Sequence, residues 1–195
     1  MFDPKKEYIL ENDRVKLIPL QLEHKKELLP YSLNEPELWK YSLTPASGVE
    51  NLENYIKKAL QDRQNLTSYP FVVLDKAVNK IIGSTRFYDF QPHHKTTQLG
   101  FTWYGKDYQG SGINKPCKFL MLEFAFDVME LQRVEFRADV NNERSIAAMK
   151  SIGCVPEGIL RNNCASETGR RDSIVLSILQ SEWKSTVKAQ LLKKI

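Results

Sequence analysis

Residues 105–114, with the sequence GKDYQGSGIN, separate a stretch that predicts a β-strand from a stretch that predicts a helix. The preceding residues 96–104 (TTQLGFTWY) are rich in aromatic and β-branched side chains, and residues 113–128 are strongly apolar. Glycines allow a backbone to approach an anion closely, and the unpaired N–H groups at a helix start point toward it. The order strand, glycine loop, helix is therefore typical of phosphate binding. Three lysines flank the loop and are expected to add positive charge: Lys106, Lys115 and Lys118.

The loop matches neither of two common phosphate-binding motifs. A P-loop needs Gly-Lys-Ser/Thr at its end, whereas Ser111-Gly112 follows Gly110 here. A dinucleotide-binding loop needs a third glycine in G-x-G-x-x-G, at the position where this chain has Lys115. On this segment alone, a nucleotide-binding module and a glycine-rich turn that leads into a core helix both stay open.

The residues before the loop predict two helices and a group of strands. The helix at 49–64 is the clearer one, because Leu52, Ile56 and Ala59 recur at helical spacing. The first helix is expected to end near Pro30, since proline lacks an N–H group, and Gly83 is a possible β-bulge. The expected elements are a strand at 14–20, helices at 21–33 and 49–64, and antiparallel strands at 69–74, 80–90 and 96–104.

The residues after the loop predict helices that alternate with strands. Residues 133–140 (RVEFRADV) alternate apolar and polar side chains and predict a strand. Asn142 is a good N-cap for a following helix, and Gly153 suits the position after its end. The remaining expected elements are strands at 154–161 and 173–179 and a helix at 180–195. An antiparallel run followed by this alternation predicts an α+β fold, a mixed and mostly antiparallel central sheet flanked by helices.

Composition limits the class of protein. The 195 residues are 42% hydrophobic and 27% charged, which is enough apolar mass for one globular domain, expected here as a core at 14–183 and a basic helical tail at 184–195. The sequence has no apolar run of about 18 residues and no apolar N-terminal segment, so we expect neither a membrane span nor a secretory signal. The three cysteines lack C-x-x-C spacing, which favours reduced thiols in a cytoplasmic protein without a structural metal. A net charge of +4 is too small to predict nucleic-acid binding, but it suits an anionic small ligand.

The motifs of the chain, taken in order, resemble one enzyme family. Gln109-x-x-Gly112 at the start of an apolar helix is similar to motif A (Q/R-x-x-G-x-G/A) of the GCN5-related N-acetyltransferases, or GNAT proteins. Asp139-x-x-Asn142-x-x-Ser145 resembles the D-x-x-N-x-x-S signature of their RimJ/RimL-like branch. Further segments match that branch in the same order: Ile82-Gly83-Ser84-Thr85, Leu99-Gly100-Phe101-Thr102-Trp103-Tyr104, Arg133-Val134-Glu135, Ile152-Gly153-Cys154, Glu157-Gly158-x-Leu160-Arg161, Arg171-Asp172 and Ser181-Glu182-Trp183. Each motif is weak alone, but their order extends the resemblance from about residue 14 to residue 183.

The resemblance implies a splayed pair of strands that holds acetyl-CoA and a site that transfers acetyl to an amine. The pyrophosphate would lie on the backbone amides of Gln109, Gly110, Ser111, Gly112, Ile113 and Asn114. The pantetheine arm would lie along Thr102, Trp103 and Tyr104, with a hydrogen bond from Asn142. Ser145 would sit near the thioester sulfur and protonate the leaving thiolate. Asn114 departs from the usual Gly or Ala of motif A, which a backbone contact tolerates.

Several of these residues also have ordinary structural roles. Asn142 and Ser145 fit the N-cap and third position of a helix, and Trp103 and Tyr104 could simply pack. The pair His93-His94 lacks a companion Asp, Glu or Cys cluster, so we expect an exposed loop and no metal site. Cys117 is expected in the helix core, and Cys164 in a loop.

The general base is the part that the resemblance leaves open. Family members often carry a glutamate where this chain has Gln98, and some carry another carboxylate where it has Cys164. Asp89 and Glu167 are spare carboxylates without motif support. We therefore expect an N-acetyltransferase acting on a protein α-amine or a small-molecule amine, as a monomer or homodimer. The alternative is a protein of the same fold that binds CoA with little or no transfer.

Overall fold

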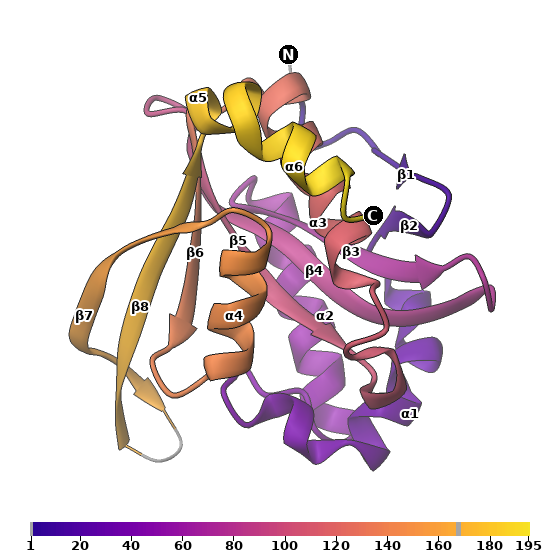
Figure 1. The fold of residues 1–195 in the computed structure, drawn as a ribbon. Helices are drawn as coiled ribbons and strands as arrows, with labels where there is room; N and C mark the ends of the chain where they lie inside the picture. The colour runs from indigo at the N-terminus through magenta and orange to yellow at the C-terminus, as the bar shows by residue number, and fades with distance from the viewer. Residues whose placement is uncertain (1, 167–168) are drawn as a thin grey trace.

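Eight strands form one sheet in the computed structural model, which describes residues 2–166 and 169–195 (Figure 1). Their order across the sheet is β1-β2-β3-β4-β5-β6-β8-β7. All neighbours are antiparallel except β5 and β6, which are parallel. The mixed, mostly antiparallel sheet expected from the sequence is confirmed. The strands are β1 (Leu10–Glu11), β2 (Val15–Pro19), β3 (Ser68–Asp75), β4 (Lys80–Gln91), β5 (Thr96–Tyr104), β6 (Arg133–Asp139), β7 (Val155–Ser166) and β8 (Gly169–Leu179).

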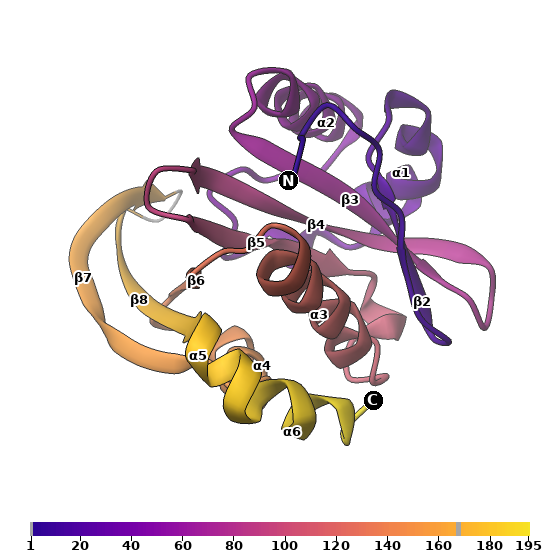
Figure 2. The same ribbon diagram turned by 90° about the horizontal axis from the view of Figure 1, so that it is seen from above.

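Helices cover both faces of this sheet. Figure 2 shows α1 and α2 on one face, and α3, α4 and the C-terminal helices α5 and α6 on the other. One turn of π-helix continues α3 at Phe124–Val128, and another joins α5 to α6 at Trp183–Val187. The helices are α1 (Lys25–Asn34), α2 (Val49–Gln64), α3 (Asn114–Glu123), α4 (Glu143–Ser151), α5 (Gln180–Glu182) and α6 (Lys188–Leu192). The described residues contain no helix long and apolar enough to span a membrane.

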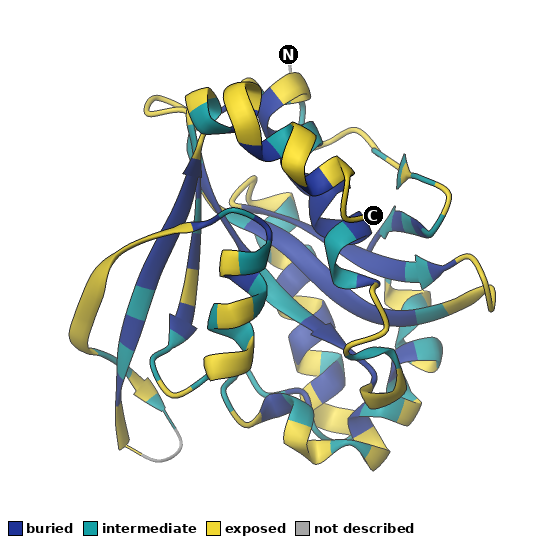
Figure 3. Cartoon of the chain, viewed as in Figure 1, coloured by how far each residue is buried: buried dark blue, intermediate teal, exposed yellow. Residues whose placement is uncertain are grey.

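Two apolar cores lie on the two faces of the sheet. The larger core joins alternate residues of the strands to α3 and to the C-terminal helix, where Trp183 is completely buried. The smaller core packs α1 and α2 against the sheet around Trp39, Tyr55 and Trp103. Figure 3 shows the buried residues along the central strands and on the inner faces of the helices. Each strand between two helix layers buries both of its faces, which is why residues 70–73 are all apolar and buried.

The parallel strands β5 and β6 pair only at one end. Thr96, Thr97 and Gln98 face Arg133, Val134 and Glu135, and no pairing continues beyond them. From Leu99 onward, β5 stays paired with β4 alone, while β6 stays paired with β8. A register shift opposite Arg86 and a positive φ of 49° at Phe101 mark the point where β5 departs. The edge of β5 from Leu99 to Tyr104 is therefore open toward β6.

Several boundaries differ from the sequence-based expectation. Helix α1 continues through Pro30 to Asn34, because the buried residues Leu28 and Ser32 on either side keep the helix packed and offset the lost hydrogen bond and the steric clash of the proline. The bulge expected at Gly83 lies one residue earlier, at Ile82. Gly83 is needed for another reason: a Cβ atom there would lie 2.0 Å from the carbonyl oxygen of Trp103.

The C-terminal strands also differ from expectation. Strands β7 and β8 extend well beyond the expected 154–161 and 173–179, so Cys164 lies in a strand opposite Arg171 and not in a loop. The short strand β1 was not expected either. Most of β7 is exposed, and its residues therefore lack the apolar alternation by which a strand is recognised.

Candidate functional site

The glycine loop turns its backbone outward just before α3. Gly110 and Gly112 have φ angles of +76° and +88°, and nothing lies within 4 Å of where their Cβ atoms would be. The side chain of Gln109 donates from Nε2 to the carbonyl of Tyr104 (2.8 Å), and Ser111 Oγ donates to the carbonyl of Tyr108 (2.6 Å). The loop is therefore held by side-chain bonds, while its two glycines are exposed at the start of a ten-residue helix.

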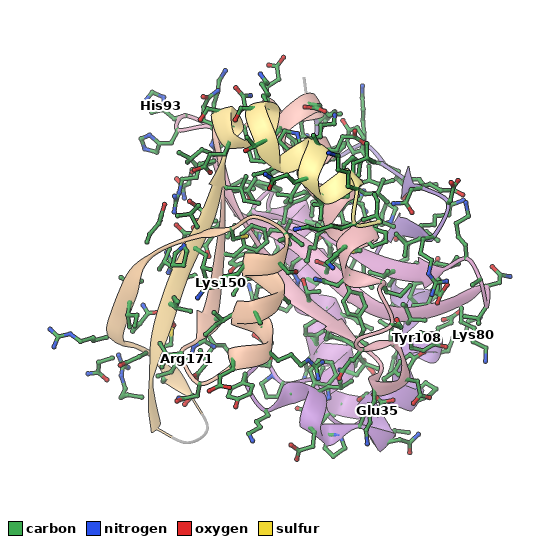
Figure 4. All side chains as sticks on the ribbon, viewed as in Figure 1. Glu35, Lys80, His93, Tyr108, Lys150 and Arg171 are labelled. Carbon is green, nitrogen blue, oxygen red and sulfur yellow. The ribbon has the colours of Figure 1, made fainter. Side chains whose placement is uncertain are left out.

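The loop is also anchored at its other end. The Glu35 carboxylate, just after α1, accepts a hydrogen bond from the backbone N–H of Lys106 (2.7 Å), and Figure 4 shows Glu35 and Tyr108 at the same end of the molecule. A side chain at Gly105 would collide with the ring of Tyr31, at 2.3 Å. Helix α1 thus sets the position of the loop relative to the sheet.

Tyr104 connects the end of β5 to the first turn of α3. Its hydroxyl donates to Asn114 Oδ1 (3.3 Å), and complete burial raises the pKa of this phenol well above its ordinary value. Ile113 is buried beneath the loop. Asn114, which departs from motif A, therefore has its side chain occupied by Tyr104, while its backbone N–H lies at the open start of the helix.

Thr102 and Trp103 point to opposite faces of the sheet. Thr102 Oγ1 lies 2.8 Å from Thr85 Oγ1, on the face covered by α3. The indole of Trp103 packs against Trp39 on the other face, with ring centroids 4.9 Å apart. Both Trp103 and Tyr104 pack their side chains inside, so only their backbone groups on the open edge of β5 are available to a ligand.

Lys118 is a buried cation that the sequence did not reveal. It was expected to flank the glycine loop, but its side chain turns into the protein with the residue only 5% exposed. Its Nζ donates to Thr102 Oγ1 (2.6 Å) and Thr85 Oγ1 (3.1 Å). No carboxylate lies within 4.0 Å of Nζ in the described chain, and burial lowers the pKa of Lys118 to about 8. The signal available in the sequence was helical spacing, because position 118 falls on the same side of the helix as the apolar residues Cys117 and Met121, and this predicts that Lys118 is buried.

The start of α4 brings Asn142 and Ser145 together. Asn142 Oδ1 accepts a hydrogen bond from the backbone N–H of Ser145 (3.1 Å), so Asn142 is a genuine N-cap. The Ser145 hydroxyl is half-buried and makes no hydrogen bond to any residue that the structure describes. The cap uses the backbone of Ser145, so its hydroxyl is left available for another partner.

Tyr41 ties the connection between α1 and α2 to this end of the sheet. Its hydroxyl donates to the carbonyl of Asn141 (3.1 Å), next to the cap residue Asn142. Its own carbonyl accepts from Arg171 Nη1 (3.2 Å) on β8. Residue 41 thus connects the segment between α1 and α2 to the β6–β8 side of the splay, a contact between distant parts of the chain that no local pattern predicts.

Gln98, at the position where a carboxylate is often found in the family, contacts a neighbouring carboxylate. Gln98 donates from Nε2 to Asp89 Oδ2 (2.8 Å), and Asp89 adopts a positive φ of 53° next to a register shift in β4. Glu135, opposite Gln98 on β6, is instead held between Arg133 and Arg137, each at 2.7 Å. Cys164 Sγ lies 3.0 Å from Asn163 Oδ1, and Glu167 lies outside the described residues. Asp89 is therefore a carboxylate that contacts β5 at Gln98, the last residue of that strand that pairs with β6.

Arg86, on β4, is a second buried cation that the sequence did not reveal. The residue is 2% exposed, and its guanidinium carbon lies 4.0 Å from the ring centroid of Phe101 and 4.7 Å from that of Tyr55. Its Nε and Nη2 atoms are buried without a hydrogen-bond partner in the described part of the chain. An unpaired buried donor of a charged group costs about 1–3 kcal/mol or more, and a cation–π contact offsets about 0.5–2 kcal/mol.

The residues considered for a metal do not form a site. His93 lies in the turn between β4 and β5 and points away from the molecule, as expected (Figure 4). Over residues 2–166 and 169–195, no group of three or more His, Cys, Asp or Glu side chains is arranged to hold a metal ion. Cys117 is buried within α3, as the sequence predicted.

Comparison with known proteins finds acetyltransferases. Residues 14–155 match the family described as the acetyltransferase (GNAT) domain. The chain is 23% identical over 175 residues to N-acetyltransferase p20 of Bacillus licheniformis, itself uncharacterized, and the match covers 89% of this chain and 97% of p20. It is 28% identical over 104 residues to YdaF of Bacillus subtilis, provisionally named a ribosomal N-acetyltransferase, over 53% of this chain and 56% of YdaF.

A solved structure supports the same grouping. A crystal structure from T. thermophilus, provisionally named an acetyltransferase, is 31% identical to this chain. It superimposes with a TM-score of 0.87 and covers all of both chains. The similarity therefore includes the C-terminal residues beyond the family match.

Proposed function

The chain belongs to the acetyltransferase (GNAT) family and is an acetyl-CoA-dependent N-acetyltransferase, and we propose that it acetylates the primary amine of a protein N-terminus or of a small molecule. The observation that carries this proposal is the splay between β5 and β6, beside the glycine loop. The similarity to YdaF supports the RimJ/RimL-like branch. We place the reaction in the cytoplasm.

The residues around the splay fit acetyl-CoA. The glycines of the loop have open space where side chains would be, and the N-terminus of α3 favours an anion such as a pyrophosphate. We assign the pyrophosphate to the amides of residues 109–114. The pantetheine arm has backbone donors and acceptors to pair with on the open edge of β5, at Thr102 to Tyr104. We assign to Asn142, at the start of α4 after β6, a hydrogen bond to the same pantetheine arm.

The chemistry then needs two proton movements. An α-amine has a pKa near 7.7–8.0, so part of it is already neutral at pH 7, and holding it next to the thioester supplies much of the rate. Gln98 itself cannot accept the proton, and we assign that step to water beside the Asp89 carboxylate, which Gln98 contacts. Ser145 donates its hydroxyl proton to the leaving thiolate and takes a proton from water in its place. A backbone N–H on the open edge of β5 stabilises the developing oxyanion.

A second candidate function is CoA binding with little or no transfer. The observation in its favour is that Gln98 and Cys164 stand where related enzymes have carboxylates. Both functions share the cofactor, so they differ only in turnover. A nucleotide-binding module is the third possibility, and it differs in the ligand.

Ligand titration followed by an acceptor panel separates the three. Thermal unfolding is measured with CoA, ATP and NAD at equal concentration. A ligand at 100 times its Kd stabilises the folded state by about 2.7 kcal/mol, which is a shift of roughly 5–10 °C for a chain of this size. We expect this shift with CoA alone, and a larger shift with ATP or NAD would contradict the assignment.

The panel then detects free thiol released from acetyl-CoA. It covers peptides with free N-termini, amino acids, polyamines and aminoglycosides. Acceptor-dependent release supports the transferase. CoA binding without release from any acceptor, with a known acetyltransferase as a positive control for the assay, supports the binding protein.

A further inference from the structure

Arg86 is a buried cation without a counter-charge. No carboxylate lies within 4.0 Å of its guanidinium among residues 2–166 and 169–195, and two of its nitrogen atoms lack any hydrogen-bond partner there. The arginines at 137 on β6 and 171 on β8 are paired. Arg137 contacts Glu135 (2.7 Å), and Arg171 donates to Ser173 and to the carbonyl of Tyr41. Among the residues that the structure describes, Arg86 is the arginine whose buried donors lack a partner.

Further buried N–H donors without a partner in the described chain lie in the same apolar core, next to the rings that contact Arg86. The indole nitrogens of Trp39 and Trp103 are also buried without partners, and these two rings lie 4.9 Å apart. Trp39 in turn lies 6.2 Å from Tyr55, the ring that contacts Arg86. The Tyr55 hydroxyl faces the carbonyl of Phe101 at 3.5 Å. An anion is the ligand that such a set of N–H donors lacks.

Arg86 lies next to the point where β5 separates from β6. Arg86 pairs with Gly100 across β4 and β5, two residues beyond Gln98, where β5 separates from β6. Its side chain lies on the face covered by α2, whereas Lys118 lies on the face covered by α3. Phe101, whose ring contacts the guanidinium, is only partly buried at the open edge. The ring of Phe101, which also packs against Tyr88 with centroids 4.9 Å apart, therefore lies between the guanidinium and the open edge of β5.

We propose that Arg86 binds a carboxylate of the acceptor, so that the acceptor class is small amines that carry a carboxylate, such as amino acids. The proposal rests on the proposed acetyl transfer. The rings of Phe101 and Tyr55 contact the guanidinium carbon, and the N–H groups of a guanidinium lie in its plane, where a carboxylate accepts two parallel hydrogen bonds. The acceptor enters past Phe101, and its carboxylate on Arg86 leaves the amine at the open edge of β5.

The test compares each amino acid with its own carboxamide, which keeps the amine and removes the negative charge. Thiol release is measured for the wild type, Arg86→Gln and Arg86→Lys. Arg63→Gln is the matched control, because Arg63 also stacks on a tyrosine, Tyr69 at 4.6 Å, but lies at the end of α2. The CoA-induced shift in melting temperature confirms that each variant is folded.

We expect kcat/KM of the wild type and of Arg63→Gln to favour the carboxylate by roughly 10- to 100-fold, the range for a charged hydrogen-bonded contact. Arg86→Gln should lose this preference and keep its activity on carboxamides, and Arg86→Lys should recover part of it. A wild type that uses carboxamides equally well would overturn the proposal. So would an Arg86→Gln protein that loses activity on both acceptors alike, since that marks a packing role.

A binding measurement tests the carboxylate site in case the protein transfers acetyl to none of the acceptors. If no acceptor releases thiol, the proposed function fails, and N-acetylglycine and N-acetylglycinamide are titrated against the CoA-bound protein. Stabilisation by N-acetylglycine alone, lost in Arg86→Gln, upholds the carboxylate site. Equal effects of the two probes, or no effect of either, contradict it.

Discussion

Two positions near the end of β5 require glycine for different physical reasons. Gly83 has no space, because the carbonyl of Trp103 lies 2.0 Å from its absent Cβ. Gly112 has space but adopts φ +88°, a conformation that costs other residues about 1–2 kcal/mol. A substitution at Gly83 therefore tests packing, and a substitution at Gly112 tests the loop and its proposed ligand.

Replacing Gly112 with valine should weaken CoA binding roughly tenfold or more, a loss of about 1.4 kcal/mol. The branched side chain opposes the positive φ and stands where the backbone approaches the pyrophosphate. Isothermal titration with CoA measures the affinity, and urea unfolding measures the fold. Gly158→Val, on exposed β7 with open space around it, is the control. Unchanged CoA affinity in Gly112→Val would mean that the loop is only a turn.

Ser145→Ala should lower kcat by roughly 10²- to 10⁴-fold and leave the KM for acetyl-CoA nearly unchanged, if the hydroxyl protonates the thiolate. The cap to Asn142 uses the backbone N–H and survives the change, so the free energy of unfolding should fall by less than about 1 kcal/mol. Ser151→Ala, which removes a hydroxyl bonded to the carbonyl of Ala148, is the control. Wild-type turnover in Ser145→Ala with a verified acceptor would rule out the acid role.

At the scale of elements, α3 connects the glycine loop to a buried lysine in the core. It begins directly after the glycine loop, and from its middle Lys118 reaches one face of the sheet, where it donates to Thr85 on β4 and Thr102 on β5. Among the described residues, the ammonium is bound by the hydroxyls of Thr85 and Thr102 and has no carboxylate partner, so the helix holds a charge in the core. The stability of this helix should therefore depend on pH.

The wild type should gain stability between pH 8 and 10, relative to Lys118→Met. Burial lowers the pKa of Lys118 to about 8 in the folded state, below the 10.5 of an ordinary lysine. In this window the unfolded chain binds more protons than the folded one, so raising the pH favours folding, by up to roughly 1.4 kcal/mol per pH unit. Below pH 8 both states are protonated and the difference is constant.

Urea unfolding of both proteins from pH 6 to 10 measures this difference. Subtracting the two curves gives the contribution of Lys118, together with its electrostatic coupling to the buried thiols of Cys117 and Cys154. Lys106→Met, which removes an exposed ammonium, is the control and should run parallel to the wild type. Parallel curves for Lys118→Met as well would show that the buried lysine stays charged throughout.

At the scale of the whole molecule, the C-terminal helices complete the larger core. The residues beyond 183 were expected as a tail outside the core, but Val187 and Leu191 are buried in it together with Trp183. The absent side chain of Gly153 makes room for Val187, whose Cγ1 lies 2.9 Å from the would-be Cβ. The last helix thus closes the layer that α3 and α4 begin.

Leu191→Ala should lower the free energy of unfolding by about 2–5 kcal/mol, the cost of a cavity at a buried leucine. The neighbouring Leu192 is 54% exposed, and Leu192→Ala should change stability by less than about 0.5 kcal/mol. Urea unfolding of both variants gives the comparison. Equal and small effects would mean that the helix does not contribute to the core.

The order of motifs determined the family, the strand–loop–helix around Gly112 and the cap at Asn142 without any coordinates. These features depend on residues close together in the sequence, because a φ angle, a cap or an apolar periodicity is set within a few positions. The same locality explains the errors. Pro30 looked like a helix end because its neighbours' packing was unknown. The partly exposed second half of β7, beyond the expected end at 161, carried no alternation to recognise.

Tertiary structure alone decided what surrounds each polar side chain. Lys118 appeared to belong to the loop, but the sheet that α3 covers turned it into a buried donor for two threonines. Arg86 has no special neighbours in the sequence, and its rings come from α2 and β5. The contact between Gln98 and Asp89 spans a hairpin with a register shift. The environment of a charge depends on which distant elements pack around it, and no local pattern encodes that packing.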